Sequence, residues 1–254
     1  MPIVHTERGD IWFADHRHDA SALTTLLIHG VGSHQDWAIQ VRRLKLLNAV
    51  AVDLPAHGRS PGEGRASVEA YADDISALLD ALALTRVRLA GHSMGGAIAL
   101  MLALAQPARA ASLILIATGA KLPVNPDLLA AARTDIEDAV SRIVEGSWAV
   151  DDAVLKAAGK ANLVRLSATT LVGDLLACNA FDVRARLHDL VQPCLIIGGE
   201  ADRMTPFKYS RYLHDHIAGS TLVGIENGGH MLMLEQPEGI TEVMRTWLVQ
   251  NSDN

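Results

Sequence analysis

Short apolar runs alternate with longer segments of helical periodicity along most of the chain. A continuous apolar run is typical of a strand buried on both faces, and apolar residues at every third or fourth position indicate a helix with one buried face. This alternation favours an α/β fold with a doubly wound, mostly parallel sheet. The predicted strands are residues 3–6, 11–16, 23–29, 48–53, 87–90, 112–117, 194–197 and 221–226. The predicted helices are residues 34–44, 68–83, 95–105 and 237–248, with a further helix that starts near Pro206.

Residues 121–188 interrupt the alternation. They are rich in alanine and leucine and contain no convincing strand pattern. Their four short helical patterns are residues 127–133, 135–146, 151–163 and 168–178. An inserted helical segment of this kind is expected to cover the carboxyl edge of the sheet, where α/β folds bind their ligands. The sequence therefore predicts a core domain of residues 1–120 and 189–254, with a helical cap of residues 121–188 inserted after the sixth strand.

Composition and charge narrow the class of protein. The 254 residues are 49% hydrophobic, which suffices for a large core. The net charge of −7, without a basic run, disfavours nucleic acid or an anionic membrane as a partner. The N-terminal residues lack the pattern of a signal peptide, and no apolar run reaches the ~18 residues of a membrane span. We therefore expect a cytoplasmic protein, a monomer or homodimer, that acts on a small molecule.

The cysteines and histidines do not form a metal-binding pattern. Cys178 and Cys194 lie in different segments and suggest neither a disulfide framework nor a zinc cluster. Two closely spaced histidine pairs have no carboxylates at ligand spacing, and we interpret them as surface residues. These pairs are His16/His18 and His214/His216. The sequence therefore predicts neither a metal nor an organic cofactor.

The clearest chemical signal is Gly91-His92-Ser93-Met94-Gly95, between a predicted strand and a predicted helix. This is the G-x-S-x-G pattern of a nucleophile elbow, which presents a serine hydroxyl at the apex of a sharp turn. Two glycines suit this turn because a close approach of strand and helix leaves no space for side chains beside the serine. Ser93 is therefore the candidate nucleophile.

A serine nucleophile needs a general base, and the base needs an acid that orients it. His230 follows two glycines after the last predicted strand, which allows the loop to approach the elbow. The strand at 194–197 is followed by Glu200 and Asp202, and we favour Asp202 because a helix near Pro206 leaves it in the loop at the carboxyl edge. The order Ser93, Asp202, His230 is the order expected for a nucleophile-elbow fold. His57 and His92 are weaker candidates for the base, because His57 lies in an early loop and the side chain of His92 is expected to point away.

Two backbone N–H groups are candidates for an oxyanion hole. The N–H of Met94 follows the serine at the start of a helix, and the N–H of Val31 belongs to the loop after the first parallel strand. That loop also supports another interpretation, because Gly30-x-Gly32 with Asp53 about twenty residues later resembles a dinucleotide-binding fingerprint. Gln35 occupies the third glycine position, so we favour the oxyanion loop.

Taken together, the chain resembles the α/β-hydrolase superfamily over nearly its whole length. The segments that carry the resemblance are His29-Gly-Val-Gly-Ser33, Asp53-Leu-Pro-Ala-His-Gly-Arg-Ser60, Gly91-His-Ser-Met-Gly-Gly96, Gly199-Glu-Ala-Asp-Arg-Met-Thr-Pro206 and Gly229-His-Met-Leu-Met-Leu-Glu-Gln-Pro237. The resemblance implies an eight-stranded sheet with an antiparallel second strand and a helical cap. It also implies Ser93, Asp202 and His230 as a catalytic triad, with Val31 and Met94 as oxyanion donors.

Within that superfamily the sequence is similar to enol-lactone hydrolases, small carboxylesterases and meta-cleavage C–C hydrolases. We therefore expect a serine hydrolase that cleaves an ester, lactone or thioester through an acyl-enzyme. The alternatives are C–C bond hydrolysis, cofactor-free haloperoxidase activity, and a ligand-binding protein without turnover.

The substrate is expected to be apolar or to carry a small acyl group. The candidate substrate-binding residues are Trp148, Leu175, Met204 and Met231. Basic residues of the predicted cap could bind a substrate carboxylate, although a solvated surface explains most of them. They are Arg133, Arg142, Lys156, Lys160 and Arg165.

Overall fold

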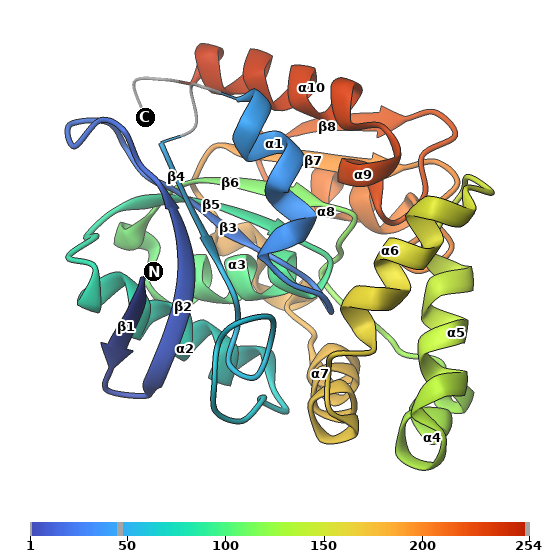
Figure 1. The fold of residues 1–254 in the computed structure, drawn as a ribbon. Coiled ribbons are helices and arrows are strands. Elements are labelled where there is room, and N and C mark those ends of the chain that lie inside the picture. The colour runs from blue at the N-terminus through green and yellow to red at the C-terminus, as the bar shows by residue number, and fades with distance from the viewer. Residues whose placement is uncertain (1, 45–47, 252–254) are drawn as a thin grey trace.

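A single sheet organises the molecule (Figure 1). Among residues 2–44 and 48–251, which the computed structural model describes, eight strands pair in the order β1-β2-β4-β3-β5-β6-β7-β8. Strand β2 is antiparallel to both of its neighbours, and all pairs from β4 to β8 are parallel. The predicted α/β class and the antiparallel second strand are confirmed. The strands are β1 (Ile3–Thr6), β2 (Gly9–His16), β3 (Thr25–Ile28), β4 (Ala49–Val52), β5 (Val87–His92), β6 (Ala110–Ile116), β7 (Cys194–Gly199) and β8 (Thr221–Ile225).

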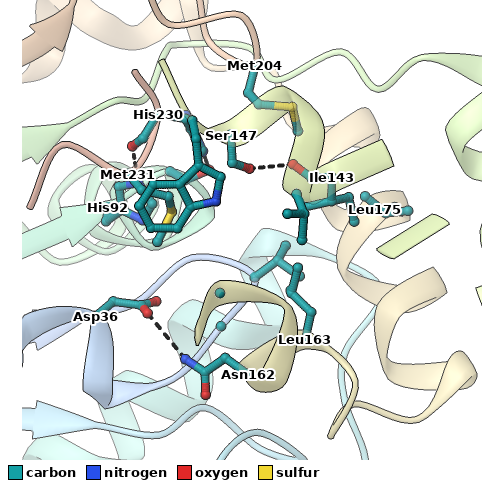
Figure 2. A pocket seen from close by; sticks show the side chains of 16 residues that line it. Asp36, His92, Ile143, Ser147, Asn162, Leu163, Leu175, Met204, His230 and Met231 are labelled. Atoms are coloured by element: carbon teal, nitrogen blue, oxygen red, sulfur yellow. Dashed lines mark hydrogen bonds between the residues drawn. The ribbon is translucent and has the colours of Figure 1, made fainter. Parts of the chain in front are cut away.

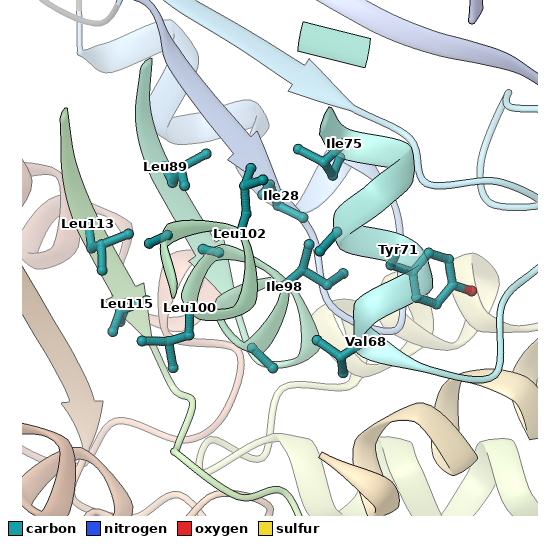
Figure 3. Close-up of a cluster of buried hydrophobic side chains, with 14 of the residues drawn as sticks. Ile28, Val68, Tyr71, Ile75, Leu89, Ile98, Leu100, Leu102, Leu113 and Leu115 are labelled. Atoms are coloured by element: carbon teal, nitrogen blue, oxygen red, sulfur yellow. The ribbon is translucent and has the colours of Figure 1, made fainter. Parts of the chain in front are cut away.

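Helices cover both faces of the sheet, which explains why its central strands are apolar without alternation. In β3, Leu26 and Ile28 pack on the face covered by α2 (Val68–Ala81) and α3 (Met94–Ala105), as Figure 3 shows for Ile28. Leu27 points to the opposite face, where it joins the cluster of α10 (Pro237–Gln250). Because helices cover both faces of the sheet, every strand position from Thr25 to Ile28 is buried.

Helix boundaries follow the predictions with three differences. The segment predicted as one helix from residue 34 divides into a 3-10 turn, η1 (His34–Trp37), and the short α1 (Ala38–Arg43). The helix predicted near Pro206 is α8 (Lys208–His216), which begins two residues later. A short helix, α9 (Leu232–Glu235), lies before α10 and was not predicted, because four residues are too few for a helical period.

Residues between β6 and β7 form a helical segment with a hydrophobic cluster of its own, here called the α4–α7 segment. Its helices are α4 (Pro126–Thr134), α5 (Ile136–Ser147), α6 (Ala153–Leu163) and α7 (Ala168–Ala180). A bridge between Lys121 and Asp182 joins the two ends of the segment. A 3-10 turn, η3 (Arg184–Asp189), leads into β7, and another, η2 (Pro107–Arg109), precedes β6. Figure 1 shows α4–α7 grouped at one side of the sheet.

The exact division into core and cap stays a prediction, and residues 1, 45–47 and 252–254 of the predicted core lie outside the described residues. In the described part of the chain, no helix has the length and apolar character needed to cross a membrane.

Candidate active site

Ser93 occupies a sharp turn between β5 and α3. Its backbone has φ 52° and ψ −120°, a combination that non-glycine residues rarely adopt and that costs about 1–3 kcal/mol. A Cβ at Gly91 would collide with the backbone of Gly95, and a Cβ at Gly95 would collide with the carbonyls of Ile28 and His29. Glycine at both positions therefore allows strand, turn and helix to approach closely enough to present the Ser93 side chain.

Hydrogen bonds hold Ser93 in this strained conformation. Its N–H donates to the Ile116 carbonyl on β6 at 3.0 Å. Its own carbonyl accepts from the Gly96 N–H at 2.9 Å and from the Thr118 hydroxyl at 2.8 Å. The cost of the backbone strain is thus offset by contacts that exist only when β5, β6 and α3 are assembled.

The structure brings together the three residues predicted as a triad. His230 Nε2 lies 2.9 Å from Ser93 Oγ, and His230 Nδ1 lies 2.9 Å from Asp202 Oδ2. A carboxylate only accepts, so Nδ1 carries a proton, and Nε2 is left to accept the hydrogen of the Ser93 hydroxyl. The three side chains come from the carboxyl ends of β5, β7 and β8, which lie at the same edge of the sheet.

The Asp202 carboxylate is buried but well supplied with donors. Oδ1 accepts from the N–H groups of Met204 at 2.8 Å and Thr205 at 2.9 Å, and Oδ2 accepts from the Thr205 hydroxyl at 2.7 Å. Burial would raise the pKa of Asp202, but His230 and these hydrogen bonds outweigh it and hold that pKa below its usual value. Asp202 is therefore ionised at neutral pH, as an acid that orients an imidazole must be.

The loop that carries His230 is held from two sides. The His230 N–H donates to the carbonyl of Ser147, the last residue of α5, at 2.9 Å. The Glu235 carboxylate accepts from the N–H groups of Gly229 and Met231, each at 3.1 Å, and from the N–H of Ala149 at 3.1 Å. One carboxylate thus connects the His230 loop to the linker between α5 and α6.

His92 does not point away from the site, as the sequence led us to expect. The centroids of the His92 and His230 rings lie 4.9 Å apart. His92 Nε2 lies 2.9 Å from the His230 carbonyl oxygen and donates to it. Burial lowers the pKa of His92 to about 3, so this imidazole is neutral. The prediction that His92 is not the base agrees with this geometry, because its ring supports the His230 backbone.

Hydrogen bonds of His29 set the orientation of the peptide between Gly30 and Val31 in the loop after β3. His29 Nε2 accepts from the Leu54 N–H at 3.0 Å, which leaves His29 Nδ1 as the donor to the Gly30 carbonyl at 2.7 Å. The C=O and N–H of a trans peptide point in opposite directions, so the Val31 N–H faces away from His29. A Cβ at Gly30 would contact Ser93 Cβ at 3.0 Å, which shows how closely this loop packs against the serine.

Two pockets meet at Ser93. The small pocket has a volume of about 70 Å³, and the large pocket has a volume of about 360 Å³. The residues shared by both are Val31, Ser93, Leu175, Met204 and His230. The small pocket also contains Trp148 and Met231, so it brings together all four predicted substrate-binding residues (Figure 2).

The large pocket contains Arg142, but this guanidinium is paired with Asp138 at 2.8 Å. The other basic residues considered for a substrate carboxylate lie outside both pockets. They are Arg133, Lys156, Lys160 and Arg165. Arg203, which the sequence did not single out, also lines the large pocket, and it donates to the carbonyls of Glu145 and Trp148.

Other candidates from the sequence have structural partners. Asp53 accepts from the backbone N–H groups of His34 at 2.8 Å and Arg59 at 2.9 Å, so its carboxylate braces two loops and does not close a ribose pocket. The interpretation of the loop at Gly30 as a dinucleotide site therefore fails. The histidine pairs expected at the surface are exposed.

The family model described as the alpha/beta hydrolase family matches residues 25–243, and the chain therefore belongs to this family. The protein is accordingly an enzyme of the hydrolase class.

Among curated proteins, the chain is 28% identical over 239 residues to a pimeloyl-[acyl-carrier protein] methyl ester esterase of Neisseria meningitidis, with 87% of this chain and 92% of that protein covered. It is 29% identical over 219 residues to 3-oxoadipate enol-lactonase 1 of Acinetobacter baylyi, covering 83% of this chain and 82% of that protein. Among solved structures, the enol-lactonase from Burkholderia xenovorans superposes with a TM-score of 0.91 at 22% identity, covering 98% and 100% of the two chains. This last likeness concerns the fold.

Proposed function

We propose that the protein hydrolyses a carboxylic ester or lactone of a small organic molecule through an acyl-enzyme on Ser93. The observation that carries the proposal is the continuous hydrogen-bonded series from Ser93 Oγ to His230 and Asp202, with both links at 2.9 Å, at the junction of two pockets. The ester and lactone substrates of the two curated relatives support the same class of reaction.

In this mechanism His230 Nε2 takes the proton of Ser93 as the hydroxyl oxygen attacks the substrate carbonyl. Asp202 stabilises the imidazolium that results and keeps Nδ1 protonated. His230 then returns the proton to the leaving alkoxide, and the acyl group stays on Ser93 Oγ. Water, deprotonated by the same imidazole, attacks the acyl-enzyme and releases the carboxylic acid.

The negative charge of each tetrahedral intermediate needs donors at the site of attack. We assign this role to the N–H groups of Val31 and Met94. Met94 is the first residue of α3, where N–H groups have no intrahelical acceptor and the helix dipole favours negative charge. Removal of one such donor typically costs about 10²–10³ in rate.

We propose further that the α4–α7 segment acts as a cap that forms one wall of the substrate site. Trp148, Ile143 and Leu163 of this segment line the small pocket, while Leu122, Val124 and other residues that precede α4 line the large one. The mostly apolar walls fit the predicted apolar or short acyl group, and the apolar positions beside Ser93 restrict the access of bulk water.

Labelling with a fluorophosphonate probe tests the proposal. The probe phosphonylates an activated serine with loss of fluoride, so we expect the folded protein to be labelled at Ser93 and the Ser93→Ala variant not to be labelled. A panel of p-nitrophenyl esters and enol-lactones then identifies the preferred bond. Absence of labelling in the folded wild-type protein, or ester turnover that persists in Ser93→Ala, would refute the mechanism.

A further inference from the structure

The small pocket has one polar corner that the proposed chemistry does not use. It is formed by Asp36 on η1 and Asn162 on α6, two elements that lie far apart in the sequence (Figure 2). The Asp36 side chain is almost fully buried, with 4% of the residue exposed. Ser33, which caps η1, is hydrogen-bonded to Asn162. Most of the remaining wall is apolar, so this corner is where the pocket can distinguish polar from apolar groups.

Hydrogen bonds fix the orientation of the Asn162 amide. The Ser33 hydroxyl donates to Asn162 Oδ1 at 3.1 Å, which directs Nδ2 toward Asp36 Oδ1 at 3.4 Å. An amide nitrogen carries two donors, and this arrangement engages only one of them, at the long end of hydrogen-bond distance. The second donor of Asn162 therefore has capacity for a ligand.

The Asp36 carboxyl group is under-supplied with partners. Among the described residues, its hydrogen-bonding neighbours are Asn162 and the backbone of Ser33. Its other oxygen lies against Gly32, where a Cβ would collide with it. Asp202, by contrast, is held by four donors. A buried carboxyl group with so few partners gains free energy from any ligand that supplies a hydrogen bond.

The chemistry of the corner selects a neutral hydroxyl. A hydroxyl can donate to the Asp36 carboxylate and accept from the second N–H of Asn162. Burial raises the pKa of Asp36 to about 7, and a hydroxyl can pair with either protonation state because it both donates and accepts. A ligand carboxylate would be repelled by ionised Asp36, and an ammonium would lose its hydration among apolar walls.

We propose that Asp36 and Asn162 form a specificity subsite that binds a hydroxyl group of the substrate in the small pocket. This inference rests on the proposed function, because it deepens the definition of the ester that Ser93 would cleave. This hydroxyl lies on whichever part of the ester enters the small pocket, either the acyl part or the alcohol part. The experiment tests these two parts separately.

The test uses isosteric pairs in which a methyl group replaces the hydroxyl. The acyl pair is p-nitrophenyl 3-hydroxybutanoate and p-nitrophenyl 3-methylbutanoate, and the alcohol pair is the 2-hydroxypropyl and 2-methylpropyl esters of butanoate. We expect wild-type kcat/KM to favour the hydroxyl member of one pair by about tenfold. Asn162→Leu and Asp36→Leu should abolish this preference by lowering kcat/KM for the hydroxyl member about tenfold more than for the methyl member.

Ala161→Leu is the matched control, because it adds similar bulk at an exposed position beside Asn162 on the same helix. It should keep the preference for the hydroxyl. A merely structural link between α6 and η1 would lower kcat/KM for both members of a pair equally. No hydroxyl preference in either pair, or a preference that survives in Asn162→Leu and Asp36→Leu, would overturn the proposal.

A binding measurement keeps the inference testable if no ester is hydrolysed. In the Ser93→Ala background, NMR titration compares the same groups without turnover. The acyl pair is 3-hydroxybutanamide and 3-methylbutanamide, and the alcohol pair is N-(2-hydroxypropyl)butanamide and N-(2-methylpropyl)butanamide. We expect about tenfold tighter binding of the hydroxyl member of one pair, lost when Asn162→Leu is added. Equal binding within both pairs would overturn the subsite, whereas absence of ester turnover with selective binding would overturn only the proposed reaction.

Discussion

Two buried histidine–aspartate pairs in this molecule have nearly the same geometry and different surroundings. His230 Nδ1 lies 2.9 Å from Asp202, and His57 Nε2 lies 2.8 Å from Asp174. The second nitrogen of His230 faces the Ser93 hydroxyl at the pockets. The second nitrogen of His57 faces the Pro55 carbonyl at 2.9 Å. The partner of the second nitrogen, and not the contact with an aspartate, therefore separates a candidate base from a structural histidine.

The partners of the two imidazole rings also decide which ring nitrogens carry a proton. A carbonyl and a carboxylate both only accept, so His57 donates from both nitrogens and is an imidazolium. Burial would lower the pKa of His57, but the Asp174 carboxylate outweighs it and raises that pKa. The Tyr71 hydroxyl also donates to Asp174, at 2.6 Å. This pair joins the loop after β4 to α7, whereas the His230–Asp202 pair leaves a nitrogen free to accept a proton.

The largest effect should follow from His230→Ala. Loss of the base should lower kcat for ester hydrolysis by at least about 10⁴-fold, because the serine, base and acid act as a unit. The melting temperature should change little, since the Asp202 carboxylate keeps its hydrogen bonds from the Met204 N–H and from the N–H and hydroxyl of Thr205. Steady-state kinetics and circular dichroism measure the two quantities. Retention of more than a tenth of the activity would contradict the role of His230.

Asp174→Ala should show the opposite pattern. Removing one partner of a buried ion pair leaves an uncompensated charge and typically costs about 3–5 kcal/mol. For a chain of this size, that loss corresponds to a fall of roughly 6–20 °C in melting temperature. At a temperature where the variant is folded, its kcat should stay within about tenfold of wild type. Asp174→Asn, which keeps a hydrogen-bonding oxygen, is the matched control and should be less destabilised.

Glu235→Ala tests whether the position of the His230 loop depends on the Glu235 carboxylate of α9. Without the carboxylate, the Gly229 N–H loses its acceptor, and the Met231 N–H keeps only the Ser147 carbonyl at 3.2 Å. The loop should then position the imidazole less well. We expect kcat to fall by about tenfold or more, with a smaller change in KM. Glu235→Gln, which keeps one acceptor oxygen, should recover part of kcat. Equal losses in the two variants would indicate that the carboxylate acts by its charge.

The smallest predicted effect is the pH dependence of the His57 pair. A histidine whose folded pKa is raised stabilises the protein fully below its unfolded pKa of about 6.5. This contribution is lost as the pH rises through the folded pKa. His57→Gln should therefore reduce the melting temperature more at pH 6 than at pH 9. A larger loss at pH 9 would contradict the assignment of His57 as an imidazolium.

Local sequence rules were sufficient for much of the candidate site. Two of its patterns span only a few residues of the sequence. They are the glycines on both sides of Ser93 and the histidine that follows two glycines after a late strand. The choice of Asp202 over Glu200 also followed from local position. In the structure Asp202 lies 2.9 Å from His230 Nδ1, whereas Glu200 is exposed. The side chain of His92 was misjudged, because its direction depends on the His230 loop, 138 residues away.

By itself, the sequence determined the α/β class, the approximate extents of the eight strands, and the three residues that meet at the carboxyl edge. It could do so because hydrophobic periodicity and turn chemistry act over short distances. Tertiary structure alone decided the roles of two other carboxylates, Asp36 and Glu235. Asp36 becomes a pocket residue only where α6 brings Asn162 beside it, and Glu235 becomes a clamp only where α5 ends against the His230 loop. The role of a polar side chain depends on its partners, and these partners come from segments that only folding brings together.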